Sequence, residues 1–435
     1  MTPEMIGVLG IVVLMILLAL KMWVGAAMTL VSIVGIIILK NVDVAWMAAG
    51  SSAFKNLNAY SFTVVPMFTL MGMIISESTM GQDLYAAAYA WVGRFRGGLA
   101  SATVVACGVL GAISGSSHVG VLVMSRAALP EMRKNGYDES FAAGSVVAGA
   151  PLSILIPPSM GFILYGIITE NSVGKLFMSG IGVGVLQMIM YILVIYIMCR
   201  INPKLGPKGP KLPMKQRLKT LAKVIPVLLL MVVVLGGIYT GKFTTTEAGA
   251  VGAFGSMVLA FIFRQITVKN FMKALRETAV LTGMIFFLIG STYLFVTFMS
   301  LSRLPMMLST MIVSWAVPRW VISVALIVLY FILGMFLPET AMVLLTIPVL
   351  YSALIKVGYD PIWLGAFVVK LMAIGSISPP VGMVCYTMNG ITGIKRNVGR
   401  LKTENIEPTS RIAGTAIIEP VVGARNLASR IKNLN

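Results

Sequence analysis

The stretch Lys134-Asn135-Gly136-Tyr137-Asp138 returns later in the chain as Lys356-Val357-Gly358-Tyr359-Asp360, and Pro157-Pro158 returns as Pro379-Pro380. Both pairs have the same offset, since 356 − 134 and 379 − 157 both equal 222. The two motifs are equally spaced in both copies, so the copies align without a gap. A shared offset across two unrelated motifs predicts an internal structural repeat, which decides the fold.

The composition around these motifs is that of a membrane protein. Of 435 residues, 58% are hydrophobic and only 11% are charged, whereas soluble domains are about a quarter charged. The net charge of +19 comes from short Lys/Arg clusters between apolar runs, without a zinc or RNA-binding motif beside them. We therefore expect a lipid bilayer around the chain and no nucleic-acid partner. Three cysteines, all in apolar segments, favour neither a disulfide framework nor a metal site.

Apolar segments of roughly 20 residues can cross ~30 Å of hydrocarbon as helices. The sequence predicts nine such spans, with short ones allowed. They are 6–20, 23–39, 58–78, 140–169, 174–199, 221–240, 246–263, 279–300 and 361–390.

Two further apolar stretches, 98–133 and 320–355, are interrupted halfway. The interruptions are Ser114-Gly115-Ser116-Ser117 and Leu337-Pro338-Glu339-Thr340. Non-helical backbone is stable at membrane depth only where protein or a water-filled cavity satisfies its polar groups. We expect both stretches to be re-entrant hairpins.

The orientation follows from the basic residues. The linker 201–219 contains Lys and Arg but no acid, which places it in the cytoplasm, with the N-terminus periplasmic and the tail cytoplasmic. On this topology the first Gly-Tyr-Asp motif is cytoplasmic and the second external, so we predict two inverted repeats, 1–200 and 220–393. The expected fold class is an all-α polytopic membrane protein, each repeat holding a re-entrant hairpin and a Pro-Pro-broken helix.

Each double proline removes backbone donors and leaves bare carbonyls beside a new helix N-terminus. Carbonyl oxygens suit Na⁺, and helix N-termini suit carboxylates. Prolines and serines also kink membrane helices without any further role, which is the alternative for each break taken singly. Four breaks in register across an inverted repeat favour transport.

Five motifs resemble one family, the large DctM-like membrane subunit of TRAP transporters. They are Gly111-Ala-Ile-Ser-Gly-Ser-Ser117, Ile154-Leu-Ile-Pro-Pro-Ser159, Ile163-Leu-Tyr-Gly166, Thr245-Thr-Glu-Ala248 and Ile377-Ser-Pro-Pro-Val-Gly382. The resemblance covers about residues 1–393. It implies an elevator-type secondary transporter in a bacterial inner membrane, coupled to Na⁺ and importing a small dicarboxylate-like organic anion. It also implies two partners, a small DctQ-like membrane subunit and a DctP-like periplasmic substrate-binding protein.

The resemblance assigns the tips and breaks to two kinds of site. Substrate-binding residues would be Ser116, Ser117, His118, Ser159, Glu339, Thr340, Val381 and Gly382. Na⁺ ligands would come from Ser114, Gly115, Ser116, Ile156, Pro157, Pro338, Gly375, Ser376, Ser378 and Pro379.

The chain departs from the family pattern in three places. Pro338-Glu339 stands where an Asp commonly follows Phe-Leu, and His118 stands where a small residue is usual. The tail 394–435 is polar and basic and lacks the expected last span, which a frameshift, a truncation or a divergent tail would explain.

Other functions remain as alternatives. An ion antiporter would need a buried acid as proton carrier, for which Glu339 is the one acid at a hairpin tip, and an inactive truncated permease is a further alternative. An enzyme is not expected, because the sequence holds no metal cluster or nucleophile motif. Lys370 could pair with a substrate carboxylate, but snorkelling to the external face is preferred. Glu247 is expected to begin a helix behind a threonine cap.

Overall fold

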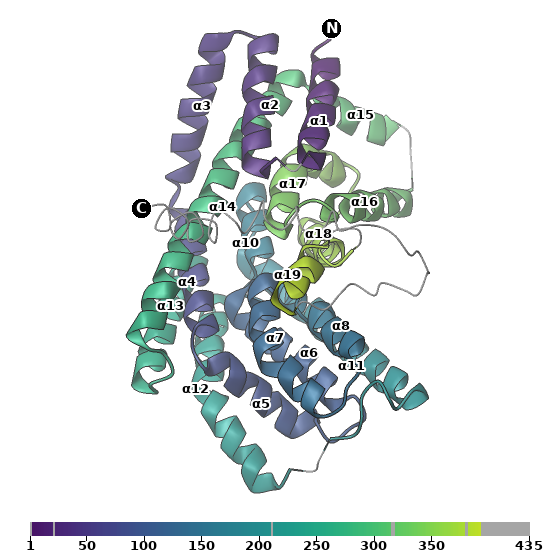
Figure 1. Cartoon of the computed structure of the whole chain (residues 1–435). Coiled ribbons are helices and arrows are strands. Elements are labelled where there is room, and N and C mark those ends of the chain that lie inside the picture. Colours follow the sequence, from purple (N-terminus) through teal and green to yellow (C-terminus); the bar gives the residue numbers. More distant parts are fainter. Residues whose placement is uncertain (1, 21, 210–211, 315–317, 379–381, 393–435) are drawn as a thin grey trace, which may run out of the picture.

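The computed structural model describes residues 2–20, 22–209, 212–314, 318–378 and 382–392. Over these residues the chain is helical, with short connections and one isolated antiparallel bridge between Arg96 and Lys208 (Figure 1). The expectation of an all-α membrane protein is confirmed in its helical content.

The helices up to residue 201 form the first half of the chain. They are α1 (Pro3–Ala19), α2 (Val24–Leu39), α3 (Val42–Leu57), the 3-10 turn η1 (Tyr60–Thr63), α4 (Val64–Ser76), α5 (Met80–Val92), α6 (Gly98–Ser114), α7 (Ser117–Lys134), α8 (Glu139–Gly149), α9 (Leu152–Leu155), α10 (Met160–Thr169) and α11 (Val173–Ile201).

The second half follows the same order. Its helices are α12 (Met214–Tyr239), α13 (Thr245–Ile262), α14 (Val268–Ser302), α15 (Leu304–Ser314), α16 (Arg319–Gly334), α17 (Glu339–Lys356), α18 (Pro361–Gly375) and α19 (Met383–Thr392).

The offset of 222 residues carries helices of the first half onto helices of the second. Helix α7 shifted by 222 has the bounds of α17, and α8 shifted in the same way begins where α18 begins. The main difference is that α14 runs unbroken for 35 residues, while the matching segment of the first half is divided into α3, η1 and α4.

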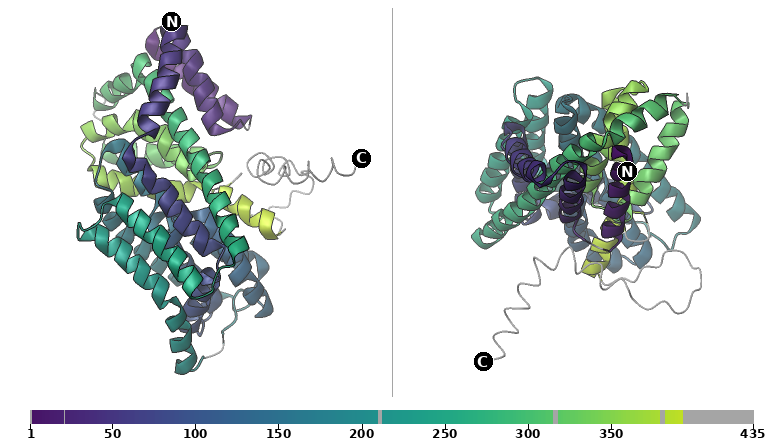
Figure 2. Two further views of the ribbon diagram at one scale, coloured as in Figure 1. Left: turned by 90° about the vertical axis from the view of Figure 1, so that its left-hand side faces the viewer. Right: turned by 90° about the horizontal axis from the view of Figure 1, so that it is seen from above.

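Contacts between the two halves occur in exchanged pairs. Helix α2 packs on α14 while α13 packs on α4, and α7 packs on α19 while α17 packs on α10. Helices α4, α13 and α14 run along one flank of the molecule (Figures 1 and 2). Exchanged contacts are the pattern of two copies related by a two-fold axis. The opposite orientation of the copies in the membrane stays a prediction.

The repeated Gly-Tyr-Asp motif has a structural role in both copies. Gly136 and Gly358 have φ of 71° and 93°, which suits the turn that ends α7 and α17. Asp138 then accepts from the Phe141 N–H at 2.8 Å to cap α8, and Asp360 accepts from the Trp363 N–H at 2.8 Å to cap α18.

The tyrosine of each motif ties the turn to the base of its own hairpin. The Leu99 N–H donates to the Tyr137 hydroxyl oxygen at 3.2 Å, at the start of α6. The Tyr359 hydroxyl donates to the Arg319 carbonyl at 2.6 Å, at the start of α16. The motif therefore fixes where each hairpin begins and where the broken helix after it starts.

Among the described residues, six helices are long and apolar enough to cross a membrane, or seven if the bent pair Tyr60–Ser76 and Met80–Val92 is one span. The expected spans 6–20 and 23–39 correspond to α1 and α2, which are apolar but have only 17 and 16 residues. At 1.5 Å per residue they fall somewhat short of ~30 Å.

Helix α3 and the linker before α12 differ from the expected spans. Helix α3 lies outside the expected spans, and residues 214–219 of the predicted linker belong to α12, so the linker is shorter than expected. Glu247 lies in a capping box with Thr244, as predicted, its carboxylate accepting from the Thr244 N–H at 2.8 Å. The predicted tail, 394–435, lies outside the described residues.

Candidate functional site

The first hairpin tip joins α6 to α7 through two residues. Gly115 has φ of 60°, a left-handed conformation that side chains disfavour, and Ser116 is extended. Ser114 and Ser117 flank this turn and are buried. The tip thus presents small hydroxyl side chains inside the protein rather than toward lipid.

The second tip joins α16 to α17 through Met335 to Pro338, with Glu339 as the first residue of α17. Glu339 is only 9% exposed, so its carboxyl group lies almost wholly inside the protein. A buried carboxylate is costly unless a cation or hydrogen bonds compensate it.

The two tips meet directly. The Ser117 hydroxyl donates to Glu339 Oε1 at 2.5 Å, and these residues are 222 positions apart. Two copies related by a two-fold axis, as the sequence predicts, would bring equivalent residues into contact only near that axis. This hydrogen bond joins such an equivalent pair. Ser376, whose hydroxyl donates to the Ala373 carbonyl at 3.0 Å, and His118 both lie near enough to influence the same carboxyl group. We call Ser117, Glu339 and Ser376 the tip junction.

The first break separates α9 from α10. Ile156 is extended, the Pro157–Pro158 peptide bond is cis, and Ser159 begins α10 without a side-chain cap. Ser159 is fully buried, and its hydroxyl has no hydrogen-bond partner among the described residues. The break therefore leaves a buried oxygen free beside a helix N-terminus.

The second break follows α18. The Ser378 hydroxyl donates to the Ile374 carbonyl at 2.8 Å, and the Val384 N–H of α19 donates to the Ser376 carbonyl at 3.2 Å. Gly382 has φ of 50° just before α19. The predicted site residues Pro379 and Val381 lie outside the described residues.

Each tip packs against the break of its own repeat through glycines. A Cβ atom added to Gly111 would lie 2.2 Å from Ser153 Cα, and one added to Gly334 would lie 2.3 Å from Gly375 Cα. A Cβ on Gly115 would lie 2.7 Å from the Pro158 carbonyl oxygen. These backbone approaches bring the predicted tip and break residues together in both halves.

Some predicted residues lie at the edge of this arrangement. His118 Nδ1 lies 3.3 Å from the Thr387 hydroxyl of α19, a partner that sequence reasoning missed. Ser116, Pro338 and Thr340 are half-buried at the tips. Within the described residues, Ser116 and Thr340 make no side-chain hydrogen bond to either break. No sequence signal links positions as distant as 118 and 387.

The side chain of Lys370 has a different position from the one expected, which was toward the external face. Its ammonium group donates to Gln187 Oε1 on α11, so the side chain packs between α18 and α11 rather than extending freely to the external face. This bond explains how a lysine is kept inside an apolar segment, and it connects Lys370 to neither tip.

The arrangement supplies oxygen ligands. Ser114 is buried at the first tip and, like Ser159, has a hydroxyl without a partner among the described residues. The two unsatisfied hydroxyls and the Glu339 carboxylate are all hard oxygen donors. Such donors suit an alkali or alkaline-earth cation.

An all-helical chain with several apolar helices, two hairpins and two broken helices has the architecture of a multi-pass membrane transporter. The family model "Tripartite ATP-independent periplasmic transporter, DctM component" matches residues 11–411. The chain belongs to this family.

Two curated relatives and one solved structure illustrate the likeness. The C4-dicarboxylate TRAP transporter large permease protein DctM of Pseudomonas aeruginosa is 35% identical over 342 residues, covering 78% of this chain and 80% of that protein. The ectoine TRAP transporter large permease protein TeaC of Halomonas elongata is 32% identical, covering 75% of this chain and 76% of that protein. The YdaH transporter of Alcanivorax borkumensis matches with a TM-score of 0.55 at 16% identity, over 79% of this chain and 80% of that one, a likeness of fold alone.

Proposed function

We propose that this large permease subunit imports a small organic acid, dicarboxylate-like in chemistry, by secondary transport coupled to Na⁺. It would work in a bacterial inner membrane with a small DctQ-like membrane subunit, and would receive its substrate from a DctP-like periplasmic binding protein. The observation that carries the proposal is the buried contact between the two hairpin tips, Ser117 to Glu339.

The charge of the tip junction favours a cation beside the anion site. Glu339 is buried, its hydroxyl partners Ser117 and Ser376 are neutral, and His118 is the one basic side chain among its partners in the described residues. A carboxylate substrate alone would add a second negative charge and raise the electrostatic cost of the bound state. Na⁺ at the junction would offset both charges, so we assign Glu339 to the cation rather than to the substrate.

Coupling would then follow from the order in which the site is completed. Na⁺ held by Glu339 and the hydroxyls of Ser114 and Ser159 would fix the tips against the breaks, and the anion would bind the N-termini of the helices that start there. A ligand shifts a conformational equilibrium only by its differential affinity for the two states. Na⁺ would therefore favour the state that binds the anion, and an elevator movement of the hairpins would carry both.

The substrate itself is chosen partly outside this chain. The two relatives of similar identity are named for a C4-dicarboxylate and for ectoine, so identity at this level does not fix the substrate. We expect the periplasmic binding protein to set the specificity and the permease to require a carboxylate.

The test is uptake into proteoliposomes containing the permease and its small subunit, with a panel of binding proteins and radiolabelled organic acids. We expect uptake of one acid that needs an inward Na⁺ gradient and stops when choline replaces Na⁺. Uptake that is equally fast without Na⁺ would contradict the coupling, and no uptake of any acid by a folded complex would contradict the substrate class.

A second candidate is a cation/proton antiporter, favoured by one observation: Glu339 is a buried acid at the tip junction, where a proton carrier would lie. An antiporter needs neither a binding protein nor an organic acid. Na⁺-driven pH changes inside liposomes that hold the permease alone would support this function instead.

A further inference from the structure

A cavity of about 330 Å³ lies apart from both hairpin tips, since its lining residues include neither tip. Its walls come from three places: the link between α4 and α5, the middle of α7, and the link between α13 and α14. Arg126 of α7 is about nine residues, or roughly 13 Å along the helix, from Ser117 at the tip. The cavity is therefore separate from the proposed transport site.

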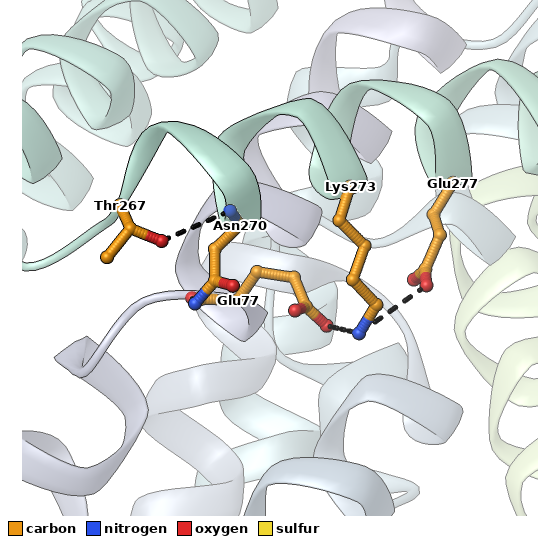
Figure 3. A network of polar contacts seen from close by, with 5 residues as sticks. All are labelled: Glu77, Thr267, Asn270, Lys273 and Glu277. Atoms are coloured by element: carbon orange, nitrogen blue, oxygen red, sulfur yellow. Dashed lines mark hydrogen bonds and ion pairs between the residues drawn. The ribbon is translucent and has the colours of Figure 1, made fainter.

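Two arginines line this cavity, Arg126 and Arg264. Both are exposed, and neither forms an ion pair within the described residues. One acid, Glu77, shares the wall, but its carboxylate lies 2.8 Å from Lys273 Nζ, which also reaches Glu277 at 3.7 Å (Figure 3). Lys273 is thus shared by two carboxylates. With the two arginines counted, three positive charges face two negative ones, and this surplus gives the cavity a preference for anions.

A neutral group in the wall also lacks a partner. Ser76, the last residue of α4, is only 9% exposed and lines the cavity, yet its hydroxyl makes no hydrogen bond to the described residues. A serine in a helix usually donates to the carbonyl four residues before it when nothing else is available. The hydroxyl oxygen is enclosed by protein, so a ligand in the cavity would reach it only after a small shift of the α4–α5 link.

Helix N-termini add to the same preference. Thr79, at the start of α5, and Thr267, at the start of α14, both line the cavity, and the helices have 13 and 35 residues. The N-terminus of a helix carries a partial positive charge and attracts anions. Thr267 already caps α14, and Asp83 lies in the first turn of α5, so the N-termini add less than the arginines do. The two arginines and the two helix N-termini line the cavity from three segments of the chain.

We propose that this cavity binds a phosphate group, supplied either by inorganic phosphate or by the headgroup of an anionic phospholipid. Arginine guanidinium groups bind phosphate oxygens through two parallel hydrogen bonds, and the hydroxyls supply further donors. The positive-inside topology predicts that the cavity opens on the cytoplasmic side, where both sources are present. The bound phosphate would connect α7 of the first hairpin to the α13–α14 link. This proposal does not depend on the transported substrate or on Na⁺.

The test measures binding to the full-length protein in nanodiscs, with two probes. One is radiolabelled inorganic phosphate with phosphatidylcholine as the lipid; the other is a fluorescent phosphatidic acid titrated into the same discs. We expect Arg126→Gln and Arg264→Gln each to weaken binding of one probe about tenfold or more, as loss of a charge-assisted hydrogen bond predicts. Ser76→Ala should weaken it less.

The matched controls are Arg303→Gln and Arg133→Gln. Arg303 shares the positive φ of Arg264, 56° against 51°, and Arg133 lies on α7 with Arg126, but neither lines the cavity. Saturable binding of phosphate identifies the free anion, and binding of phosphatidic acid alone identifies a lipid headgroup. If neither probe binds, or if the controls lose as much affinity as the cavity variants, the proposal is wrong.

Discussion

The two hairpin tips occupy matching places in the repeat but contribute different chemistry. The first turns at Gly115 and presents hydroxyls, while the second turns at Pro338 and presents the Glu339 carboxylate. They meet in a single hydrogen bond between positions 222 residues apart. The comparison shows how a symmetric frame can hold an asymmetric site, since only one copy supplies the negative charge that a cation needs.

The supporting helices differ as well. The second copy has one continuous helix, α14, where the first has α3, η1 and α4, and α4 bends by 68° into α5. The cavity beside Ser76 lies at the bend between α4 and α5, whereas the equivalent junction of the second copy, between α14 and α15, does not line it. The frame around the tips is therefore shared, while the bend between α4 and α5 has a cavity of its own.

The largest effect on transport is expected from changing which hairpin tip carries the charge. Glu339→Gln should lower Na⁺-dependent uptake about tenfold or more, because a hydrogen-bonded charge is lost from a buried site. The double variant Ser117→Glu with Glu339→Ser keeps both groups but exchanges them across the axis. We expect it to recover part of the uptake. Activity of Glu339→Gln equal to that of the unaltered protein would show that the charge has no role.

The packing of tips on breaks should be sensitive to a single methyl group. Gly334→Ala and Gly111→Ala place a Cβ against backbone and should lower stability by about 1–3 kcal/mol each in thermal unfolding. Gly283→Ala is the control, because nothing lies within 4 Å of its added Cβ, and it should be neutral or stabilising by about 0.5–1 kcal/mol. Equal stability of all three variants would mean that the tips do not rest on the breaks.

The unpartnered hydroxyls should matter only when the cation is present. Ser114→Ala and Ser159→Ala should change stability without Na⁺ by less than about 0.5 kcal/mol, since no hydrogen bond is lost, but should weaken Na⁺ binding. Ser153→Ala is the contrasting variant, because its hydroxyl donates to the Cys107 carbonyl at 3.4 Å. If Ser159→Ala lowered the stability in choline chloride as much as Ser153→Ala does, the Ser159 hydroxyl would have a structural partner instead.

A further effect is expected at the contact between the copies. Lys273→Ala removes the ion pair with Glu77, whose side chain is only 6% exposed, while the lysine side chain is 46% exposed. Solvent screens only the lysine end of the pair, so we expect a loss of about 1 kcal/mol, the upper end of the range for exposed pairs. Thermal unfolding at low and high salt checks this value, with Lys269→Ala as control. A larger loss of stability would show that the contact between Glu77 and Lys273 stabilises the fold as much as the packing of the tips does.

The sequence predicts the places where the chain breaks because those places carry local signals. Ser114 to Ser117 and the double prolines interrupt apolar runs, and the shared offset aligns them. Helix α3 carries no such signal, since Asp43 and Ser51 make it too polar for a span search. Its position depends on packing against α14.

The contacts across the repeat could not be predicted in the same way. The offset of 222 pairs every residue of one copy with a residue of the other, and Ser117 with Glu339 is one such pair. Only the folded structure determines which of these pairs are in contact. The bond between Lys370 and Gln187 depends on how α18 lies against α11, 183 residues apart in the chain. Such contacts are set by tertiary packing, which sequence periodicity does not encode.

The most direct test of a cation at the tip junction is thermal unfolding of the purified protein in NaCl and in choline chloride at equal ionic strength. A ligand at 100 times its dissociation constant stabilises by about 2.7 kcal/mol, so specific Na⁺ binding should raise the unfolding temperature measurably. We predict this rise for the unaltered protein and its loss in Glu339→Gln. The same rise in both proteins, or none in the unaltered one, would contradict a Na⁺ site at Glu339.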